Sequence, residues 1–201
     1  MMSNKLILTE FLELSMDREL LTEKEQKLMD EGDEVYLAGV MQRADSLNGN
    51  GRVYSRDILE REVENYQKIV REGRAVGELD HPESSVVELK NVSHLVTQIA
   101  MQGDSVVGKV RILETGPGKT VKELLRGGVK LGISSRGLGS TREENGKTYV
   151  EDDFQLICFD LVSEPSTTGA YMLREGKENS VFTKADRINR VLNSILKEEK
   201  K

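Results

Sequence analysis

The segment VSHLVTQIAMQGDSVVGKVRIL, Val92–Leu113, decides the fold class that the sequence predicts. Apolar and polar residues alternate on both sides of the Gly-Asp pair Gly103 and Asp104, which predicts two strands joined by a tight turn. Strands that follow one another through short turns pair antiparallel, whereas regular alternation of strands and helices is typical of parallel sheets. The segment therefore indicates a mostly antiparallel sheet.

Helices and further strands are predicted around this hairpin. The clearest helix is SRDILEREVENYQKIVREG, residues 55–73, in which Ser55 can cap the start and Gly73 ends the helix. A short helix is predicted from about Thr120 to Arg126, where glycines close it. Apolar runs predict strands in further segments, namely 34–42, 74–79, 129–140 and 147–166, the last of which has room for one strand or two.

The order of these elements predicts an α+β fold, a single domain with a mostly antiparallel or barrel-like sheet. Two segments look appended to this domain. Residues 1–33 form a charged N-terminal segment with helical periodicity, and residues 176–201 form a C-terminal tail whose end, 184–201, has the pattern of a helix. We therefore place the domain itself at residues 34–175.

The composition limits the classes of protein to which the chain can belong. Of 201 residues, 37% are hydrophobic and only 4% are aromatic, so one core built from aliphatic side chains is expected. The net charge of −6 argues against a broad nucleic-acid surface and against an anionic membrane surface, because both need a basic excess. No apolar run approaches the roughly 20 residues of a membrane-spanning helix, and the N-terminus becomes charged too early for a signal peptide. The single cysteine, Cys158, excludes an internal disulfide and favours a reducing cytoplasm.

Two patterns that suggest a small ligand or a metal are incomplete. GPGKT, residues 116–120, resembles the end of a phosphate-binding loop, but that motif needs a glycine at position 113, where the chain has Leu113. A loop that begins a helix is the preferred interpretation. Several acidic residues surround His81 in sequence, namely Glu78, Asp80 and Glu83. Their spacing matches neither a zinc-binding helix nor a calcium loop, so we expect no metal and no cofactor.

A histidine and a pair of serines are the candidates for catalytic chemistry. GELDHPESS, residues 77–85, holds His81, one of only two histidines in the chain. LGISSRGLGS, residues 131–140, places Ser134 and Ser135 at the end of an apolar strand before a glycine-rich turn. A nucleophilic serine needs a rigid strand end, a base within reach and N–H groups that face the developing oxyanion. Serine and glycine also crowd ordinary loops, so the pattern by itself leaves both interpretations open.

Two further polar residues interrupt apolar strands. Asp160 lies within LICFDLV, residues 156–162, where a buried carboxylate is costly unless it is paired. It is either exposed on an edge strand or an acid that orients a histidine, and periodicity does not decide between them. His94 alternates with valines in the hairpin, and a structural role is the preferred interpretation for it.

Three segments in this order, GELDHP, GGVKLGISSRGLGS and FDLVSEPSTTGAYM, closely resemble the prohead (capsid maturation) serine proteases of large tailed bacteriophages, in particular those of T-even-like phages. NGRVYSRDILEREVENY, residues 50–66, resembles the loop and helix that precede them in that family, and the resemblance covers about residues 35–175. The family is similar in fold to the herpesvirus capsid assembly proteases. The resemblance therefore implies a β-barrel core with surrounding helices.

The resemblance also implies a serine endopeptidase with a three-residue site. The family histidine falls on His81, the nucleophile falls on Ser134 with the adjacent Ser135 as the alternative, and the third member falls best on Asp160. His81 would take the proton of the serine, and Asp160 would orient the imidazole. Backbone N–H groups near two residues are the candidate oxyanion donors, namely Arg136 and Gly137.

Members of this family are made as zymogens inside the immature capsid in the host cytoplasm, so the resemblance implies the prohead interior as the site of action. They cleave scaffold, capsid and internal proteins and also themselves, and T-even-like members favour cleavage after the glutamate of an aliphatic-x-Glu triplet. Such triplets end at Glu10, Glu23 and Glu198 in the two appended segments, and another ends at Glu175. The resemblance therefore implies removal of one or both segments on activation. Relatives can form rings, which implies a homo-oligomer. From the acidic net charge we expect no nucleic-acid or membrane partner.

Other functions also fit parts of the sequence. A non-catalytic prohead core or scaffold protein could share the fold, but chemically competent residues at all three implied positions favour the protease. A nucleotide-dependent enzyme would use GPGKT, and nucleotide binding would test it. An oligomeric interaction protein would be separated from the protease only by hydrolysis that is lost on substitution.

Overall fold

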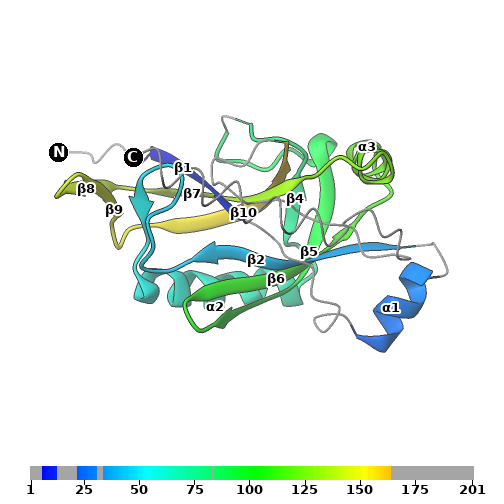
Figure 1. Ribbon diagram of the computed structural model, residues 1–201, viewed down its shortest axis with the longest axis horizontal. Coiled ribbons are helices and arrows are strands. Elements are labelled where there is room, and N and C mark those ends of the chain that lie inside the picture. Colours follow the sequence, from blue (N-terminus) through cyan, green and yellow to red (C-terminus); the bar gives the residue numbers. More distant parts are fainter. Residues whose placement is uncertain (1–5, 13–21, 31–33, 83, 164–201) are drawn as a thin grey trace, which may run out of the picture.

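The computed structural model describes residues 6–12, 22–30, 34–82 and 84–163, and Figure 1 labels their helices and strands. In chain order these are β1 (Leu6–Leu12), α1 (Glu23–Asp30), β2 (Val35–Arg43), β3 (Arg52–Val53), α2 (Arg56–Arg71), β4 (Val76–Glu78), the short 3-10 helix η2 (Leu89–Asn91), β5 (Val92–Gln102), β6 (Ser105–Ile112), α3 (Gly116–Arg126), β7 (Gly132–Gly139), β8 (Thr141–Glu144), β9 (Lys147–Val150) and β10 (Gln155–Val162). This mixture of many strands and few helices confirms the α+β class.

The predicted hairpin is present as β5 and β6, which pair antiparallel at the centre of the larger sheet. That sheet has the strand order β2-β6-β5-β4, and a second sheet has the order β1-β7-β10. A small third sheet, β3-β9-β8, ends in the β8–β9 hairpin that projects from the domain at the left of Figure 1. All pairings are antiparallel except that of β3 with β9.

The expectation of a barrel-like core needs correction, because the described strands do not close into a barrel. The two larger sheets meet through one parallel bridge, Leu79 to Leu161, just beyond the end of β4. β4 ends at Glu78, and Asp80, which follows the bridged Leu79, has a left-handed backbone that is not strand geometry. The core thus lies between two antiparallel sheets whose described backbones pair with each other at this bridge, and the candidate site lies beside it.

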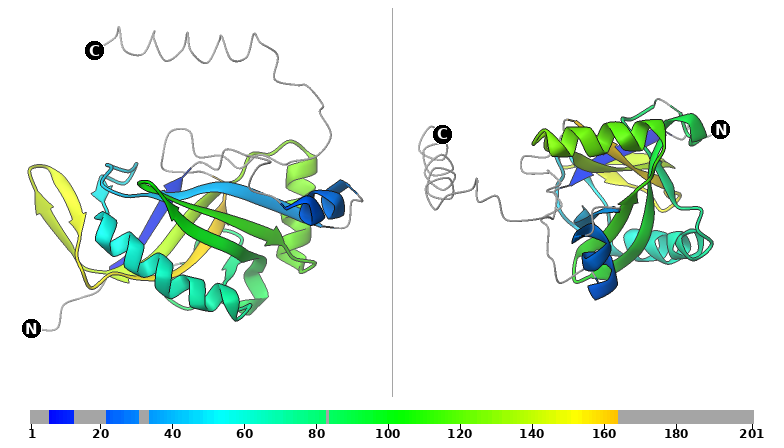
Figure 2. Two further views of the ribbon diagram at one scale, coloured as in Figure 1. Left: turned by 90° about the horizontal axis from the view of Figure 1, so that it is seen from below. Right: turned by 90° about the vertical axis from the view of Figure 1, so that its right-hand side faces the viewer.

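Helices cover the sheets on opposite sides of the molecule (Figure 2). α2 packs against β5 and β10, and its start is capped because Ser55 Oγ accepts a hydrogen bond from the Ile58 N–H at 3.4 Å. α3 packs against β5 and β6 and begins at Gly116, before the predicted Thr120, because Thr115 Oγ1 accepts from the Gly118 N–H at 3.1 Å. The cap explains why the helix includes the GPGKT segment.

Side chains from both larger sheets and from α2 and α3 pack into one core. It is mainly aliphatic, as the composition predicts, and it includes two edge-to-face aromatic contacts, Tyr54 with Phe154 and Tyr66 with Phe159. The second contact packs α2 against β10 directly beside Asp160. The core therefore fixes the strand that carries the candidate acid.

The N-terminal segment contains a strand that its helical periodicity did not predict. Residues Leu6–Leu12 form β1, which pairs with β7, and only the later part forms a helix, α1. Pairing with a distant strand overrides the local pattern, since strand formation depends on tertiary partners. The predicted helix at 184–201 lies outside the described residues, and the boundaries at 34–175 stay a prediction.

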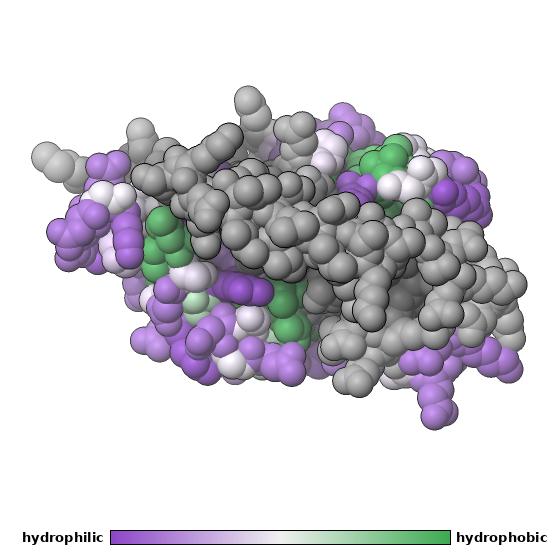
Figure 3. Space-filling view, in the orientation of Figure 1, coloured by the Kyte–Doolittle hydropathy of each residue, from purple (hydrophilic) through white to green (hydrophobic). Residues whose placement is uncertain are grey.

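The described surface in the view of Figure 3 is mostly hydrophilic, with small hydrophobic areas. Lys109 Nζ, which is buried, lies 2.6 Å from Glu25 Oε2 and so joins α1 to β6. None of the described helices has the length and apolar character needed to cross a membrane.

Candidate functional site

Three predicted residues meet where the two larger sheets join. His81 Nδ1 lies 2.8 Å from Asp160 Oδ2, and His81 Nε2 contacts Ser134 Oγ at hydrogen-bonding distance. Because an ionised carboxylate only accepts hydrogen bonds, Nδ1 carries the proton and Nε2 is free to accept from the serine hydroxyl. The imidazole therefore has the tautomer that a general base requires.

His81 reaches this position because the chain turns sharply after β4. Asp80 has a left-handed backbone with a φ of 66°, within the left-handed region of about +50 to +70°. Its N–H donates to the Leu161 carbonyl at 2.7 Å. Aspartate tolerates this conformation better than most residues, which explains its place before the histidine. The turn leaves the Asp80 side chain exposed and directs the chain away from the β4 ladder.

The two adjacent serines occupy different environments on β7. Ser134 and Ser135 point to opposite faces of the sheet, as successive strand residues do. Ser134 Oγ contacts His81, whereas Ser135 Oγ is buried without a hydrogen-bond partner among the described residues. Only Ser134 is thus brought to the histidine.

Asp160 lies at the centre of a dense set of hydrogen-bond donors and is fully buried. Besides His81, the backbone N–H of Glu78 donates to its Oδ1 at 3.0 Å and the Cys158 thiol lies 3.4 Å from the same oxygen. Burial by itself raises the pKa of Asp160, but the bonds from His81 and Glu78 and the charge of Arg136 hold that pKa below its ordinary value. The carboxylate is therefore ionised at neutral pH.

Sequence reasoning missed the side chains of Arg136 and Glu78. Both are fully buried, and Arg136 Nη2 donates to Asp160 Oδ1 at 3.2 Å. Arg136 Nε lies 2.9 Å from Asp160 Oδ2 as an ion-pair contact without hydrogen-bond geometry. A period-two pattern gives a signal for Arg136, because it lies two residues from Ser134 and must therefore share its face of β7.

His94 supports Asp160 indirectly from the neighbouring sheet. Its Nε2 donates to the Phe159 carbonyl at 2.9 Å, and its Nδ1 lies 2.9 Å from Ser93 Oγ. Complete burial lowers the pKa of His94 to about 4, despite the opposing effect of the Asp160 charge, so the ring is neutral. Gly77 makes room for this contact, because a Cβ there would lie 1.9 Å from the Phe159 carbonyl oxygen. His94 thus has a structural role, as predicted, because its hydrogen bond joins the two sheets beside the candidate acid.

The predicted oxyanion donors lie within the sheet. β7 is the central strand, and Gly137 pairs with Leu8 on one side and with Leu156 on the other. Arg136 is likewise flanked by residues of β1 and β10. Both edges of β7 are thus occupied here, and the donor role of Arg136 and Gly137 stays a prediction.

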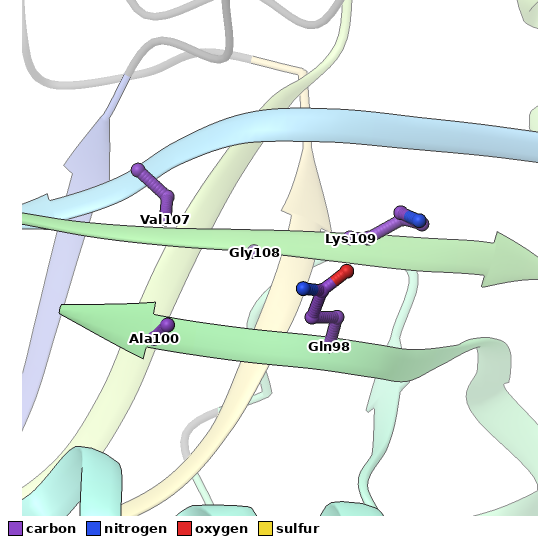
Figure 4. Close-up of a pocket in the computed structure, with 5 residues that line it drawn as sticks. All are labelled: Gln98, Ala100, Val107, Gly108 and Lys109. Carbon is purple, nitrogen blue, oxygen red and sulfur yellow. The ribbon is translucent and has the colours of Figure 1, made fainter. Parts of the chain in front are cut away.

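Other candidate ligand sites gain no support. The GPGKT segment begins α3, and within the described residues no group of three or more acidic, histidine or cysteine side chains could hold a metal ion. A cavity of about 20 Å³ lies between β5 and β6, where Figure 4 shows Gln98 and Lys109 on neighbouring strands. It has room for about one water molecule and does not include the residues around His81.

The candidate self-cleavage sites lie in different surroundings. Glu10 is in β1, where its Cα pairs with Ser135, and the side chain of Leu8 in the same triplet is buried. Glu23 is exposed at the first turn of α1. Glu175 and Glu198 lie outside the described residues.

Comparisons with known proteins show which proteins this chain is similar to. A family model described as prohead core protein serine protease matches residues 12–180. The prohead core protein protease of Enterobacteria phage T4 is 32% identical over 157 residues, which cover 76% of this chain and 74% of that protein. The solved structure of the bacteriophage T4 capsid assembly protease is similar with a TM-score of 0.69 and 25% identity, over 81% of this chain and 100% of that one.

Proposed function

The chain belongs to the family of prohead core protein serine proteases, and we propose that it cleaves peptide bonds with Ser134 as nucleophile, His81 as general base and Asp160 as the acid that orients the base. Membership makes the chain a peptidase of phage capsid maturation. The observation that carries the residue assignment is that the His81 ring touches Ser134 Oγ through one nitrogen and Asp160 through the other.

The proposed reaction is acyl transfer in two steps. Ser134 Oγ attacks the scissile carbonyl carbon while His81 Nε2 takes the hydroxyl proton, and Asp160 stabilises the positive charge on the imidazole. His81 then gives this proton to the leaving amine as the C–N bond breaks. Water attacks the acyl-enzyme while His81 Nε2 takes its proton, and His81 returns this proton to Ser134 Oγ as the ester bond breaks and the acid product leaves. In this proposal backbone N–H groups at Arg136 and Gly137 stabilise the oxyanion.

We also propose that the full chain is a zymogen controlled by access to the site. Ser134 has 0% exposure, and the His81 side chain has 17%, although their contact distances already suit catalysis. Activation would then uncover an assembled site. A small fluorophosphonate should label Ser134 slowly in the full chain and at least about tenfold faster after processing. Equal rates in both forms would contradict control by access.

Self-cleavage in this proposal begins at Glu23. The bond after Glu23 is exposed at the start of α1, whereas the triplet that ends at Glu10 is held in β1 with Leu8 buried. Proteases bind their substrates as extended segments, so a cleavage site must first leave its place in the fold. Local unfolding of the first turn of a short helix costs less free energy than removal of a strand from a sheet. Mass spectrometry over a time course should detect cleavage after Glu23 before cleavage after Glu10. The C-terminal site at Glu198 is part of the same proposal.

The proposed substrates are the phage scaffold and capsid proteins inside the prohead, cut after the glutamate of aliphatic-x-Glu triplets. The same proposal includes ring-shaped homo-oligomers and synthesis in the host cytoplasm. It also includes a likeness in fold to the herpesvirus capsid assembly proteases.

The deciding experiment compares self-cleavage and cleavage of a Leu-Thr-Glu peptide in four chains: wild type, Ser134→Ala, Ser135→Ala and His81→Ala. We expect Ser134→Ala and His81→Ala to stay intact and Ser135→Ala to be processed. Loss of cleavage in Ser135→Ala alone would assign the nucleophile to Ser135 in place of Ser134. Hydrolysis that persists in both Ser134→Ala and His81→Ala would overturn the proposed site. Absence of cleavage in processed wild type, together with failure to react with the fluorophosphonate, would favour the non-catalytic core protein.

A further inference from the structure

A buried guanidinium and a second buried carboxylate stand beside the proposed site. Arg136 and Glu78 are both 0% exposed, and Arg136 Nη2 lies 3.7 Å from Glu78 Oε2. The same guanidinium contacts both carboxylate oxygens of Asp160, at 3.2 Å from Nη2 to Oδ1 and 2.9 Å from Nε to Oδ2. Arg136 therefore bridges two buried acids, only one of which the proposed mechanism uses.

The pair also holds the loop that carries His81. Arg136 Nη1 donates to the Ser84 carbonyl at 2.6 Å, and a Glu78 carboxylate oxygen accepts a hydrogen bond from the backbone N–H of Glu88. These contacts anchor the loop between β4 and η2 at two points after His81. One buried ion pair thus fixes the acid on β10 and restrains the loop that presents the base.

The charges of this cluster are unequal when His81 is neutral. Asp160 and Glu78 each carry a negative charge and Arg136 carries one positive charge, so one negative charge remains uncompensated. A buried charge without a partner is costly because the protein interior screens charge poorly. The charges balance when His81 accepts the serine proton, which is the moment at which a general base needs stabilisation.

We propose that Arg136 is a positioning residue that holds Asp160 and the His81 loop in place, and that Glu78 supplies the extra negative charge that balances the protonated imidazole. This inference rests on the proposed function of His81, Ser134 and Asp160. Neither side chain is exposed, so neither contacts substrate in this structure. Both act through the residues that do.

Other ionisable groups lie near His81, and a change in their charge would also change its protonation. Asp80 precedes it in the chain, Asp160 contacts it from β10, Cys158 contacts Asp160, and His94 on β5 bonds the carbonyl of the residue before Asp160. Burial raises the pKa of the Cys158 thiol, and burial keeps His94 neutral, so neither changes charge around neutral pH. A change in the protonation of His81 that follows substitution of Glu78 therefore reports on the Glu78 charge.

The first test replaces the charge of Glu78 and measures protonation directly. The chain has only two histidines, so the ring signals in ¹⁵N nuclear magnetic resonance can be assigned with His81→Ala and His94→Gln. In Glu78→Gln the pH at which the His81 ring takes up a proton should fall by roughly one unit, because a balancing negative charge is lost. An unchanged midpoint overturns the role of Glu78. This measurement needs no enzymatic activity.

A matched control is available in a second buried glutamate. Glu62 is 6% exposed, pairs with Arg61 and accepts from the Leu156 N–H at 2.8 Å, away from the His81 contacts. Glu62→Gln removes one buried negative charge in the same way and should leave the His81 midpoint unchanged. A shift of similar size in both variants would show that the effect is not specific to Glu78 and would overturn the inference.

The second test separates the positioning role of Arg136 from its contribution to folding. With processed enzyme and a Leu-Thr-Glu peptide, kcat should fall roughly 100-fold or more in Arg136→Met, with KM changed less than about threefold. Arg136→Lys keeps the charge without the planar fork and should recover part of kcat. The double variant Arg136→Met, Glu78→Gln should recover most of the melting temperature, because Asp160 alone remains charged and the cluster keeps the single uncompensated negative charge of the wild type, yet kcat should stay low.

Recovery of kcat together with melting temperature in the double variant would mean that Arg136 serves folding alone, and that would overturn its positioning role. The same assays separate this inference from the proposed function. If Ser134→Ala and His81→Ala remain active, the proposed function fails. If they are inactive while Glu78→Gln and Arg136→Met behave like wild type, only the further inference fails.

Discussion

Asp160 Oδ2 lies 2.8 Å from His81 Nδ1, although the two residues are 79 positions apart in the chain. Four donors surround the carboxylate, from the His81 ring, the Glu78 backbone, Arg136 Nη2 and the Cys158 thiol, and Arg136 Nε adds an ion-pair contact. Donors on three neighbouring strands and one loop fix its orientation, so the imidazole that it holds is fixed as well.

Replacement of Asp160 with asparagine should abolish most activity without unfolding the chain. The amide keeps the shape of the carboxylate, but it can donate to His81 Nδ1 and so favours the wrong tautomer, with the proton on Nε2. We expect kcat to fall by about 10³–10⁴ in the cleavage of a Leu-Thr-Glu peptide. Asp152→Asn, at a side chain that is 91% exposed, is the control and should keep wild-type kcat. Activity within tenfold of wild type in Asp160→Asn would remove the carboxylate from the mechanism.

His94 should make stability depend on pH in mildly acidic solution. Its pKa is about 4 in the folded chain, against about 6.5 when unfolded, so the unfolded state binds the proton more readily. The free energy of unfolding should therefore fall as the pH falls from about 6.5 towards about 4, with a loss of about 3 kcal/mol from this group.

His94→Gln tests this contribution, because glutamine can still donate to the Phe159 carbonyl but does not titrate. Urea unfolding of both chains at several pH values should show that the gap between their stabilities narrows by about 3 kcal/mol on acidification. If the free energies of unfolding of the two chains change equally with pH, His94 does not resist protonation in the folded chain.

Gly77→Ala should strongly destabilise the junction between the sheets. The new Cβ would lie 1.9 Å from the Phe159 carbonyl oxygen and 2.4 Å from His94 Nε2, and neither atom is at the end of a flexible chain. We expect a loss of about 3 kcal/mol in stability, at the upper end of typical overpacking. Activity should fall too, since Asp160 follows Phe159. Gly116→Ala, where a Cβ meets open space, is the matched control and should unfold like wild type in thermal melts.

Lys109→Met should speed self-cleavage after Glu23. The buried Lys109 ammonium holds Glu25, and the Thr22 backbone and hydroxyl donate to the same carboxylate at 2.8 and 2.9 Å. Loss of the lysine should loosen the start of α1 and raise the initial rate of cleavage there by about threefold or more, as measured by mass spectrometry. Arg142→Met breaks the exposed ion pairs of Arg142 on β8 with Glu144 and Glu151 and should leave that rate unchanged. A slower cut in Lys109→Met would contradict the protective role of this contact.

The sequence was enough to predict the elements that depend on residues close to one another in the chain. The β5–β6 hairpin follows from alternation around Gly103, and α2 follows from the cap at Ser55 and the stop at Gly73. The resemblance of three short segments was enough to single out His81, Ser134 and Asp160 before any contact between them was known, because spacing and order along a chain are properties of the sequence.

Tertiary structure decided what depends on distant partners. Residues 6–12 form a strand because β7 pairs with them, and Ser134 rather than Ser135 meets His81 because the pleat of β7 turns alternate side chains to opposite faces. The ion pair of Arg136 with Glu78 could not be predicted, since the energy of a buried charge depends on which groups surround it in space. The sequence by itself determined which residues could do the chemistry, and only the fold decided which of them are buried together.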